Sequence, residues 1–508
     1  KSSTKHLKNI NEDNDPNARN PMLYDPLQEG NVRTTKKMQY VATIVICLGA
    51  ISAGTALAWT APVLPQLSVD EDDPLYMTVD RPTFSHSLIN VMKTYLYYIT
   101  GTWTSSLLAI GALVSALPSG FIADIIGRKY TAIVMDIPII ISWASIIFAN
   151  APGWLYFGRF MMGISVGSFC VIIPMYISEI AETSIRGTLG TFFQLFLTIG
   201  ILLVYIVGAY VDWVYLSAVC SFFPIALLVS MFFLPETPTY LLKKGRRGDA
   251  ALSLKWLWGR YCDSRTAIQQ IQSDLDKTSG GASFTELFTK MGNLKGLGIS
   301  MTLMFFQQFS GINAVIFFTV QIFKSAGSTM DASVSSIIVG VVQVLMTFVS
   351  ALLIERAGRK VLLLFSSTIM AVCLAILGTY FNLKHHGHDV SGIGWLPLLS
   401  VVLFIVAFSV GYGPIPWLMM GEIFVPSVKG LAASLTVLFN WILVFVVTKS
   451  FDLMVLSWGS DLTFWFFSTF MIVGTLFVAF FVFETKGKTA AEIQMQLEGV
   501  KPTSTNSG

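Results

Sequence analysis

The chain has 508 residues, of which 54% are hydrophobic and only 12% are charged, and its formal net charge is +3. A soluble core cannot bury that much apolar surface, so the composition excludes a soluble globular protein and indicates a membrane protein. The small net charge gives no support for a nucleic-acid partner.

Twelve apolar stretches long enough to cross a bilayer follow one another along the chain. A spanning helix needs about 20 apolar residues. Stretches of that length end near Ala61, Ile126, Ala149, Ser178, Tyr210, Leu234, Ile322, Ile354, Phe381, Gly421, Ser450 and Phe483. The first 39 residues are polar and lack the regions of a signal peptide, so we expect the first span to be retained.

Basic residues indicate which ends of the spans face the cytoplasm. They gather before the first span, in the short connections and after the last span, at Lys36, Lys37, Arg128, Lys129, Arg186, Arg356, Arg359, Lys360, Lys429, Lys486 and Lys488. The positive-inside rule therefore predicts that both termini are cytoplasmic. The histidines His385, His386 and His388 fall in an outward loop without a nearby carboxylate pair or cysteine, so no metal site is expected.

About 60 mostly polar residues separate spans six and seven. They predict an organisation into an amino-terminal tail (1–39), a six-helix bundle (40–234), a helical linker (235–295), a second six-helix bundle (296–484) and a carboxy-terminal tail (485–508). Within the linker, apolar residues at helical spacing follow Asp249 and Asp263, which are plausible helix caps. We expect short amphipathic helices that lie beneath the bundles.

Two charged clusters each occur twice, about half the chain apart. Asp124, Gly127, Arg128 and Lys129 recur as Glu355, Gly358, Arg359 and Lys360, and Glu179, Arg186 and Gly187 recur as Glu422, Lys429 and Gly430. The duplication predicts two related halves around a central cavity, as in alternating-access transporters. We expect carboxylates and arginines of these clusters to pair and to close the cytoplasmic side, although each cluster taken alone also fits a topology anchor.

Polar side chains within the apolar stretches are few, and nearly all are uncharged amides: Gln194, Gln307, Gln308, Asn313, Gln343 and Asn440. An amide offers donors and an acceptor, which suits the hydroxyls of a sugar, whereas a charged substrate would require an opposite charge. Trp417, next to Pro414 and Pro416, is placed to stack on a sugar face where the helix is weakened. The alternative for each single amide is a hydrogen bond between helices.

From about Gln39 to Thr489 the chain resembles the sugar porters of the major facilitator superfamily. The resemblance lies in the Gly-Arg-Lys turns at Gly127 and Gly358, Gly158-Arg159-Phe160, Pro174-Met175-Tyr176, Pro235-Glu236-Thr237-Pro238, the segment from Gln307 to Asn313, the segment from Gly413 to Trp417, and Glu484-Thr485-Lys486-Gly487. It implies an all-α membrane fold of twelve helices in two pseudo-symmetric six-helix bundles with a cytoplasmic helical linker.

The resemblance also assigns roles to residues. Sugar binding falls on Gln194, Gln307, Gln308, Asn313, Trp417 and Asn440, to which we add Gln343. Gating falls on Phe317, Phe318, Pro414, Pro416, Asp124, Gly127, Arg128, Arg159, Glu179, Arg186, Glu236, Glu355, Arg359, Glu422 and Glu484. The subgroup that the chain resembles comprises facilitated glucose and insect-type trehalose transporters, but Phe317, Phe318, Ser409 and Phe483 depart from the pattern of glucose carriers.

Energy coupling depends on whether a carboxylate lies in the transport path. Proton-coupled members of the family keep an aspartate in span one, opposite the arginine of span four, whereas Gly54-Thr55-Ala56-Leu57 contains no acid. We therefore expect Arg159 to bond hydroxyls, amides or carbonyls. Asp136 lies about 9 Å inside the cytoplasmic boundary of the membrane, whereas Arg159 lies near the outer boundary, so the two are too far apart to pair. We expect Asp136 to bond neighbouring helices or the helix end that carries Arg128 and Lys129.

These observations predict a facilitative uniporter that moves a neutral sugar such as glucose or trehalose across the plasma membrane by alternating access, without a cofactor and as a monomer. The alternatives are a proton-coupled sugar symporter and a sugar sensor on the same fold. A channel is less consistent with gate residues in both halves. No nucleotide loop, metal ligand set or activated nucleophile indicates an enzyme.

Overall fold

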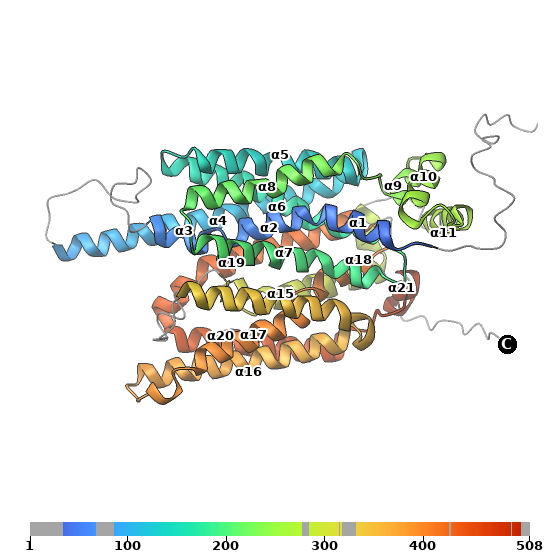
Figure 1. Cartoon of the computed structure of the whole chain (residues 1–508). Coiled ribbons are helices and arrows are strands. Elements are labelled where there is room, and N and C mark those ends of the chain that lie inside the picture. Colours follow the sequence, from blue (N-terminus) through green and yellow to red (C-terminus); the bar gives the residue numbers. More distant parts are fainter. Residues whose placement is uncertain are drawn as a thin grey trace, which may run out of the picture.

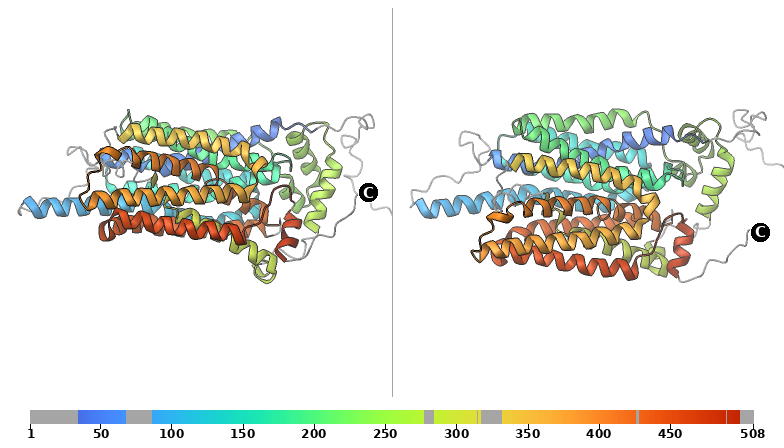
Figure 2. Two further views of the ribbon diagram at one scale, coloured as in Figure 1. Left: turned by 90° about the horizontal axis from the view of Figure 1, so that it is seen from below. Right: turned by 60° about the horizontal axis from the view of Figure 1, so that its bottom comes forward.

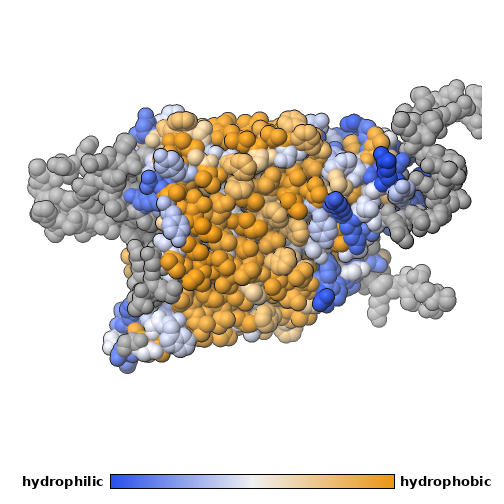
Figure 3. Space-filling view, in the orientation of Figure 1, coloured by the Kyte–Doolittle hydropathy of each residue, from blue (hydrophilic) through white to orange (hydrophobic). Residues whose placement is uncertain are grey.

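The computed structural model describes residues 34–67, 86–276, 284–313, 315–316, 332–425, 428–488 and 490–498. Within these ranges the chain is helical and contains no strand. The helices run roughly side by side in two bundles, and on the face shown in Figure 3 an apolar belt lies between two polar ends (Figures 1 and 3). Such a belt is the surface that a lipid bilayer requires.

The first bundle contains six spans. The first is built from three consecutive helices, and each of the others is one helix: α1 (Lys37–Ile46), α2 (Leu48–Ala58), α3 (Thr60–Leu67), α4 (His86–Ile126), α5 (Arg128–Ile147), α6 (Pro152–Ile180), α7 (Arg186–Gly208) and α8 (Trp213–Met231). Helix α4 has 41 residues and begins well before the apolar stretch that predicted it.

The second bundle repeats this arrangement. Its helices are α13 (Met291–Gln308), α15 (Ala332–Ala357), α16 (Arg359–His385), α17 (Leu396–Val410), α18 (Ile415–Ile423), α19 (Lys429–Trp458) and α20 (Ser460–Phe481), and a short 3-10 turn, η3 (Ser391–Ile393), precedes α17. Helix α19 continues eight residues past the end expected at Ser450, because a helix is not obliged to stop where its apolar run does.

Eleven helices within the described residues are long and apolar enough to span a membrane. The seventh expected span is the exception, since α13 ends at Gln308 and helical conformation resumes only at Ile312 after a turn at Gly311 (φ +79°). Its expected end at Ile322 lies outside the described residues. The expected fold class, an all-α membrane protein with the twelve-helix superfamily architecture, is confirmed.

The tenth span is broken into α17 and α18. Gly411 and Gly413 donate their N–H groups back to carbonyls near the end of α17, and Pro414 and Pro416 then begin α18. Because proline has no N–H to donate, the chain cannot continue one unbroken helix through this segment. The break lies where the sequence pattern predicted a weakened helix.

The linker forms α9 (Pro238–Lys243), α10 (Arg247–Trp258), α11 (Ser264–Asp276) and α12 (Phe284–Thr289), and α21 (Ala490–Glu498) follows the last span. Helices α9 to α11 and α21 gather at one end of the bundles, here called the linker end (Figure 2). Asp263 caps α11 by accepting hydrogen bonds from two N–H groups. Asp249 is no cap, because α10 already begins at Arg247.

Candidate functional site

A row of three amides joins α13 to α19 inside the second bundle. Asn313 donates to Gln308, and the Gln308 amino group donates to the Asn440 side-chain oxygen at 2.8 Å. Gln308 and Asn440 are 4% and 2% exposed. The acceptor of Asn313 and the amino group of Asn440 have no partner within the described residues. The row therefore presents one acceptor and one donor at its ends, which is what a hydroxyl group needs.

Gln307 points in a different direction from its neighbour. Its amino group donates to the carbonyls of Tyr412 and Gly413 at 2.7 and 3.1 Å, so both of its donors are used on the break between α17 and α18. Buried carbonyls freed by a broken helix must find donors, and Gln307 supplies them. Only its side-chain oxygen remains for another partner.

The two remaining amides lie on helices that pack across the two halves. Gln194 on α7 and Gln343 on α15 are 7% and 1% exposed, and α7 packs against α15. The oxygen of Gln343 has no hydrogen-bond partner in the described part of the chain. Each half thus contributes uncharged polar groups that sequence alone had singled out.

Trp417 packs against the other half. Its ring lies 5.6 Å from the ring of Phe193 on α7, centroid to centroid, and it is 8% exposed. Gly190, one turn before Phe193, faces the side chain of Leu418. These apolar contacts join α18 to α7. Phe317 and Phe318, the expected aromatic outer gate, lie outside the described residues.

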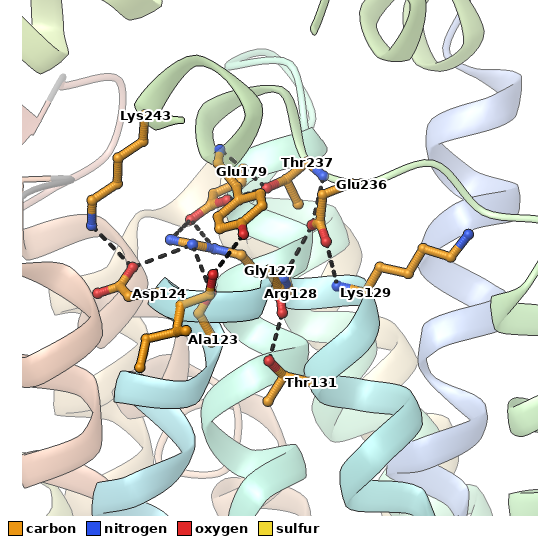
Figure 4. A network of polar contacts seen from close by, with 12 residues as sticks. Ala123, Asp124, Gly127, Arg128, Lys129, Thr131, Glu179, Glu236, Thr237 and Lys243 are labelled. Atoms are coloured by element: carbon orange, nitrogen blue, oxygen red, sulfur yellow. Dashed lines mark hydrogen bonds and ion pairs between the residues drawn. The ribbon is translucent and has the colours of Figure 1, made fainter. Parts of the chain in front are cut away.

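A network of charges surrounds Arg128 at the linker end of the first half (Figure 4). The Arg128 guanidinium pairs with Asp124 at 3.2 Å and with Glu179 at 2.9 Å. The Glu236 carboxylate accepts hydrogen bonds from the backbone N–H groups of Arg128 and Lys129 at 3.1 and 3.0 Å, so it caps the start of α5. Burial raises the pKa of Glu236 above its ordinary value, and the N–H groups of Thr237 and Lys129 partly offset that effect, as does the charge of Arg128.

The second half repeats this network around Arg359. Its guanidinium pairs with Glu422 at 2.8 Å and with Glu355 at 3.3 Å. The Glu484 carboxylate accepts from the backbone N–H groups of Arg359 and Lys360 at 2.9 and 3.1 Å. The duplication seen in sequence is therefore a duplication of contacts.

Glycine is required before each capped helix. Gly127 and Gly358 have φ angles of +100° and +85°, a region that other residues rarely adopt. A Cβ atom at Gly127 would also collide with the carboxylate of Glu236, and one at Gly358 with that of Glu484.

The acid of each half also meets the first turn of a helix from the other half. Asp124 faces Gly430 at the start of α19, and Glu355 faces Gly187 at the start of α7. A carboxylate near the first turn of a helix is favoured by the unpaired N–H groups there. The halves are thus joined at the linker end by two crossed contacts. Arg186, which precedes Gly187, donates to the carbonyl of Ala181 at 3.4 Å.

Arg159 lies within the first half and is 1% exposed. It donates to the carbonyls of Thr104 at 3.0 Å and Ala56 at 2.6 Å, and its guanidinium sits 5.7 Å from the centre of the Trp59 ring. The expectation that Arg159 bonds carbonyls is met. Ala56 lies on α2, Thr104 lies on α4 and Trp59 lies between α2 and α3, all within the same half, so these contacts do not join the halves.

Asp136 on α5 is fully buried and faces the backbone of Leu228 on α8. Neither of its oxygens makes a hydrogen bond of good geometry within the described residues. The expected bond to Arg128 or Lys129 is absent there, because Arg128 is engaged by the charge network and Lys129 donates to the carbonyl of Phe232.

Sequence reasoning missed two threonines of the networks. Thr237 donates to Glu179 at 2.6 Å, and Thr485 donates to Glu422 at 2.7 Å. Both directly follow a capping glutamate, so the repeated Glu-Thr pair was a usable signal. It also missed Lys243 of α9, which pairs with Asp124 at 3.1 Å and has no counterpart among the described ion pairs of the second half.

The two related helical halves, their duplicated charge networks and their buried amides define a membrane transporter of the major facilitator class. The chain belongs to the sugar (and other) transporter family, whose model matches residues 75–497. This family consists of transporters and not of enzymes.

Two curated relatives are similar over 464 residues, which is 91% of this chain. They are the facilitated trehalose transporters Tret1 of Drosophila yakuba and of Anopheles gambiae, and each is 40% identical to this chain. The matched part covers 52% of the length of the first relative and 56% of the second. The chain therefore spans about half the length of the curated relatives it matches. Among solved structures, the proton:xylose symporter XylE bound to 6-bromo-6-deoxy-D-glucose matches with a TM-score of 0.77 and 25% identity, over 91% of this chain and 99% of that one.

Proposed function

We propose that this protein is a facilitative sugar uniporter that moves a neutral sugar such as glucose or trehalose across the plasma membrane by alternating access. The observation that carries the proposal is the buried row of uncharged amides, Asn313, Gln308 and Asn440, whose end donor and end acceptor have no partner among the described residues. The similarity to the facilitated trehalose transporters Tret1 supports a sugar substrate.

In this proposal the substrate site comprises Gln194, Gln307, Gln308, Asn313, Gln343, Trp417 and Asn440. Residues from α13, α15, α18 and α19 of the second half would face Gln194 of the first. Uncharged amides bind hydroxyls of either a monosaccharide or a disaccharide, so they are compatible with both glucose and trehalose. The Phe193 and Trp417 rings would close the apolar floor between this site and the linker end.

Alternating access follows from the crossed contacts at the linker end, which we place in the cytoplasm together with both termini. Asp124 against α19 and Glu355 against α7 hold the two halves together there. Opening this end requires both carboxylates to leave their opposite helices, while each keeps its arginine within its own half. The arginine pairs keep the cost of that separation low, since neither acid is left alone.

Each half is proposed to move as one body between these states. The proposed division is a first bundle of residues 40–234, a linker of residues 235–295 and a second bundle of residues 296–484, between tails 1–39 and 485–508. We propose that the substrate cavity lies between the bundles of one chain, so that a monomer would suffice.

The surroundings of Arg159 support uniport over proton symport. A symporter needs a carboxylate that gains and loses a proton in the path, whereas Arg159 is satisfied by two carbonyls and the Trp59 ring. One observation favours proton symport instead: Asp136 is a buried carboxyl without a hydrogen-bond partner in the described chain. Proton-coupled transport through Asp136 is therefore the second candidate.

Uptake by proteoliposomes distinguishes the two. Labelled glucose and labelled trehalose are supplied outside, with and without an imposed pH gradient. A uniporter equilibrates the sugar, and the inside concentration levels off at the outside value in both conditions. Accumulation above the outside concentration that depends on the pH gradient overturns uniport in favour of symport, and failure to move any labelled sugar overturns both.

A further inference from the structure

A strap at the start of the described chain contacts both the loop before α7 in the first half and the end of the linker helix α10. The strap comprises residues Thr34 to Gln39. The Thr34 hydroxyl donates to the Glu182 carboxylate at 3.4 Å, and the Gln39 side chain accepts from the Glu182 N–H at 2.9 Å. The Thr35 N–H donates to the carbonyl of Trp258, the last residue of α10, at 2.8 Å.

Glu182 lies in the short loop that leads from α6 into α7. The backbone N–H of Ile185 donates to the carbonyl of Glu182, and α7 begins one residue later at Arg186. Gly187, the next residue, is where Glu355 of the other half makes its contact. The strap thus holds the loop that positions one of the two crossed contacts closing the linker end.

Thr34 is well placed for a charge switch. It is exposed, and residues 34–36 are not helical, so a modifying enzyme is able to reach the hydroxyl. In sequence it is surrounded by basic residues, with Arg33 before it and Lys36 and Lys37 after it. Its one described side-chain partner is a carboxylate, which a phosphate group repels.

We propose that Thr34 is a phosphorylation site for a serine/threonine kinase that selects basic sequences, and that its phosphorylation opens the linker end. In this step the Thr34 Oγ1 forms a bond to the γ-phosphorus of ATP, the bond from that phosphorus to ADP breaks, and the hydroxyl proton passes to the base of the kinase. ADP leaves, and Thr34 carries a phosphate with about two negative charges.

Phosphorylation changes the residues with which the Thr34 side chain interacts. The phosphate is repelled by Glu182 and attracted to the neighbouring Lys36 and Lys37, so the strap leaves the loop before α7. The loop then constrains Gly187 less strongly, and the contact with Glu355 weakens. Exposed charge pairs of this kind change an equilibrium by about 0.2 to 1 kcal/mol, which corresponds to a change of about 1.4- to 5-fold in the population of the open state.

The first test maps the phosphate. The full chain, purified and reconstituted, is incubated with ATP and protein kinase C, and its peptides are analysed by mass spectrometry. Phosphate is expected on Thr34, and it is expected to disappear in Thr34→Ala but to persist in Thr35→Ala, the matched control. Phosphate on other residues only, or no incorporation, overturns the site.

The second test measures opening without any sugar. Spin labels are placed at Lys244→Cys on the linker and Lys488→Cys after the last span, since both lysines are exposed and the five native cysteines are buried. Thr34→Glu and the phosphorylated protein are expected to raise the population with well separated labels about 1.4- to 5-fold. Adding Glu182→Gln is expected to suppress the rise, whereas Ser273→Glu on the exposed face of α11 is expected to cause none.

An unchanged distance distribution in Thr34→Glu, or a rise that Glu182→Gln does not suppress, overturns the switch. The consequence for sugar uptake rests on the proposed function. Neither of the two tests depends on it, because neither measures sugar transport. If the protein proved not to transport sugar while Thr34→Glu still changed the distance between the labels, the switch would remain supported. Failure of the transport proposal and failure of the switch can therefore be distinguished.

Discussion

The carboxylate of Glu355, near the end of α15, lies against Gly187 at the start of α7, which belongs to the other half of the molecule. No space remains for a Cβ atom at Gly187, because it would overlap both Glu355 and the guanidinium of Arg359. The pseudo-symmetric contact of Asp124 with Gly430 leaves more room. The contact between the halves is therefore tighter at Gly187 than at Gly430, and Gly187 offers a direct way to perturb it.

Gly187→Ala is expected to open the linker end and to lower sugar uptake about tenfold. The added methyl group forces the Glu355 carboxylate away from α7, so the state with this end closed becomes less populated. Uptake of labelled sugar and the distance between labels at Lys244→Cys and Lys488→Cys measure the effect. Gly298→Ala is the matched control, since nothing lies within 4 Å of a Cβ atom there; equal behaviour of the two variants would rule out the crossed contact as a gate.

Gln308→Ala is expected to slow uptake about tenfold or more while the protein stays folded. The change removes the middle of the amide row, so Asn440 loses the donor to its oxygen and Asn313 loses its acceptor. Leaving buried polar groups unpaired costs about 1 to 3 kcal/mol, which is large for a binding site. The exposed Gln270→Ala is the control, and thermal unfolding checks the fold; normal sugar kinetics in Gln308→Ala would remove this residue from the site.

Thr237→Val and Thr485→Val are each expected to lower the free energy of unfolding by about 1 to 2 kcal/mol. Each removes a hydrogen bond to a partly buried glutamate, Glu179 or Glu422, without changing the size of the side chain much, and Thr237→Val also removes the oxygen that accepts from the Tyr240 N–H. The two networks lie in different halves, so the double variant is expected to show the sum of the single effects. Denaturant or thermal unfolding measures all three; strong non-additivity would mean that the halves do not act as separate bodies.

Asp136→Asn is expected to leave sugar uptake and its response to pH unchanged. The amide keeps the size of the side chain, and Asp136 makes no well-formed hydrogen bond within the described chain that the change would break. Equal rates with and without a pH gradient, for the variant and the parent protein alike, are the expected result. A pH-driven accumulation in the parent that disappears in Asp136→Asn would instead identify this carboxyl as the coupling group.

Local pattern was enough to predict much of this protein. The apolar lengths predicted the spans, and the duplicated clusters predicted that Arg128 and Arg359 would sit in equivalent surroundings. A span depends on about 20 consecutive residues, and each arginine pairs with an acid only four positions before it. Features that depend on residues close together in the sequence can therefore be predicted from the sequence.

Only the tertiary structure decided which groups meet across long separations. Gln307 donates to the carbonyls of the α17–α18 break, Trp417 packs on Phe193, and Arg159 bonds carbonyls of two other helices. These contacts join residues far apart in sequence, and they depend on how helices tilt and rotate against one another. Spacing along one helix gives the face on which a residue lies but not the neighbour that this face meets, because that neighbour is chosen by packing of the whole bundle.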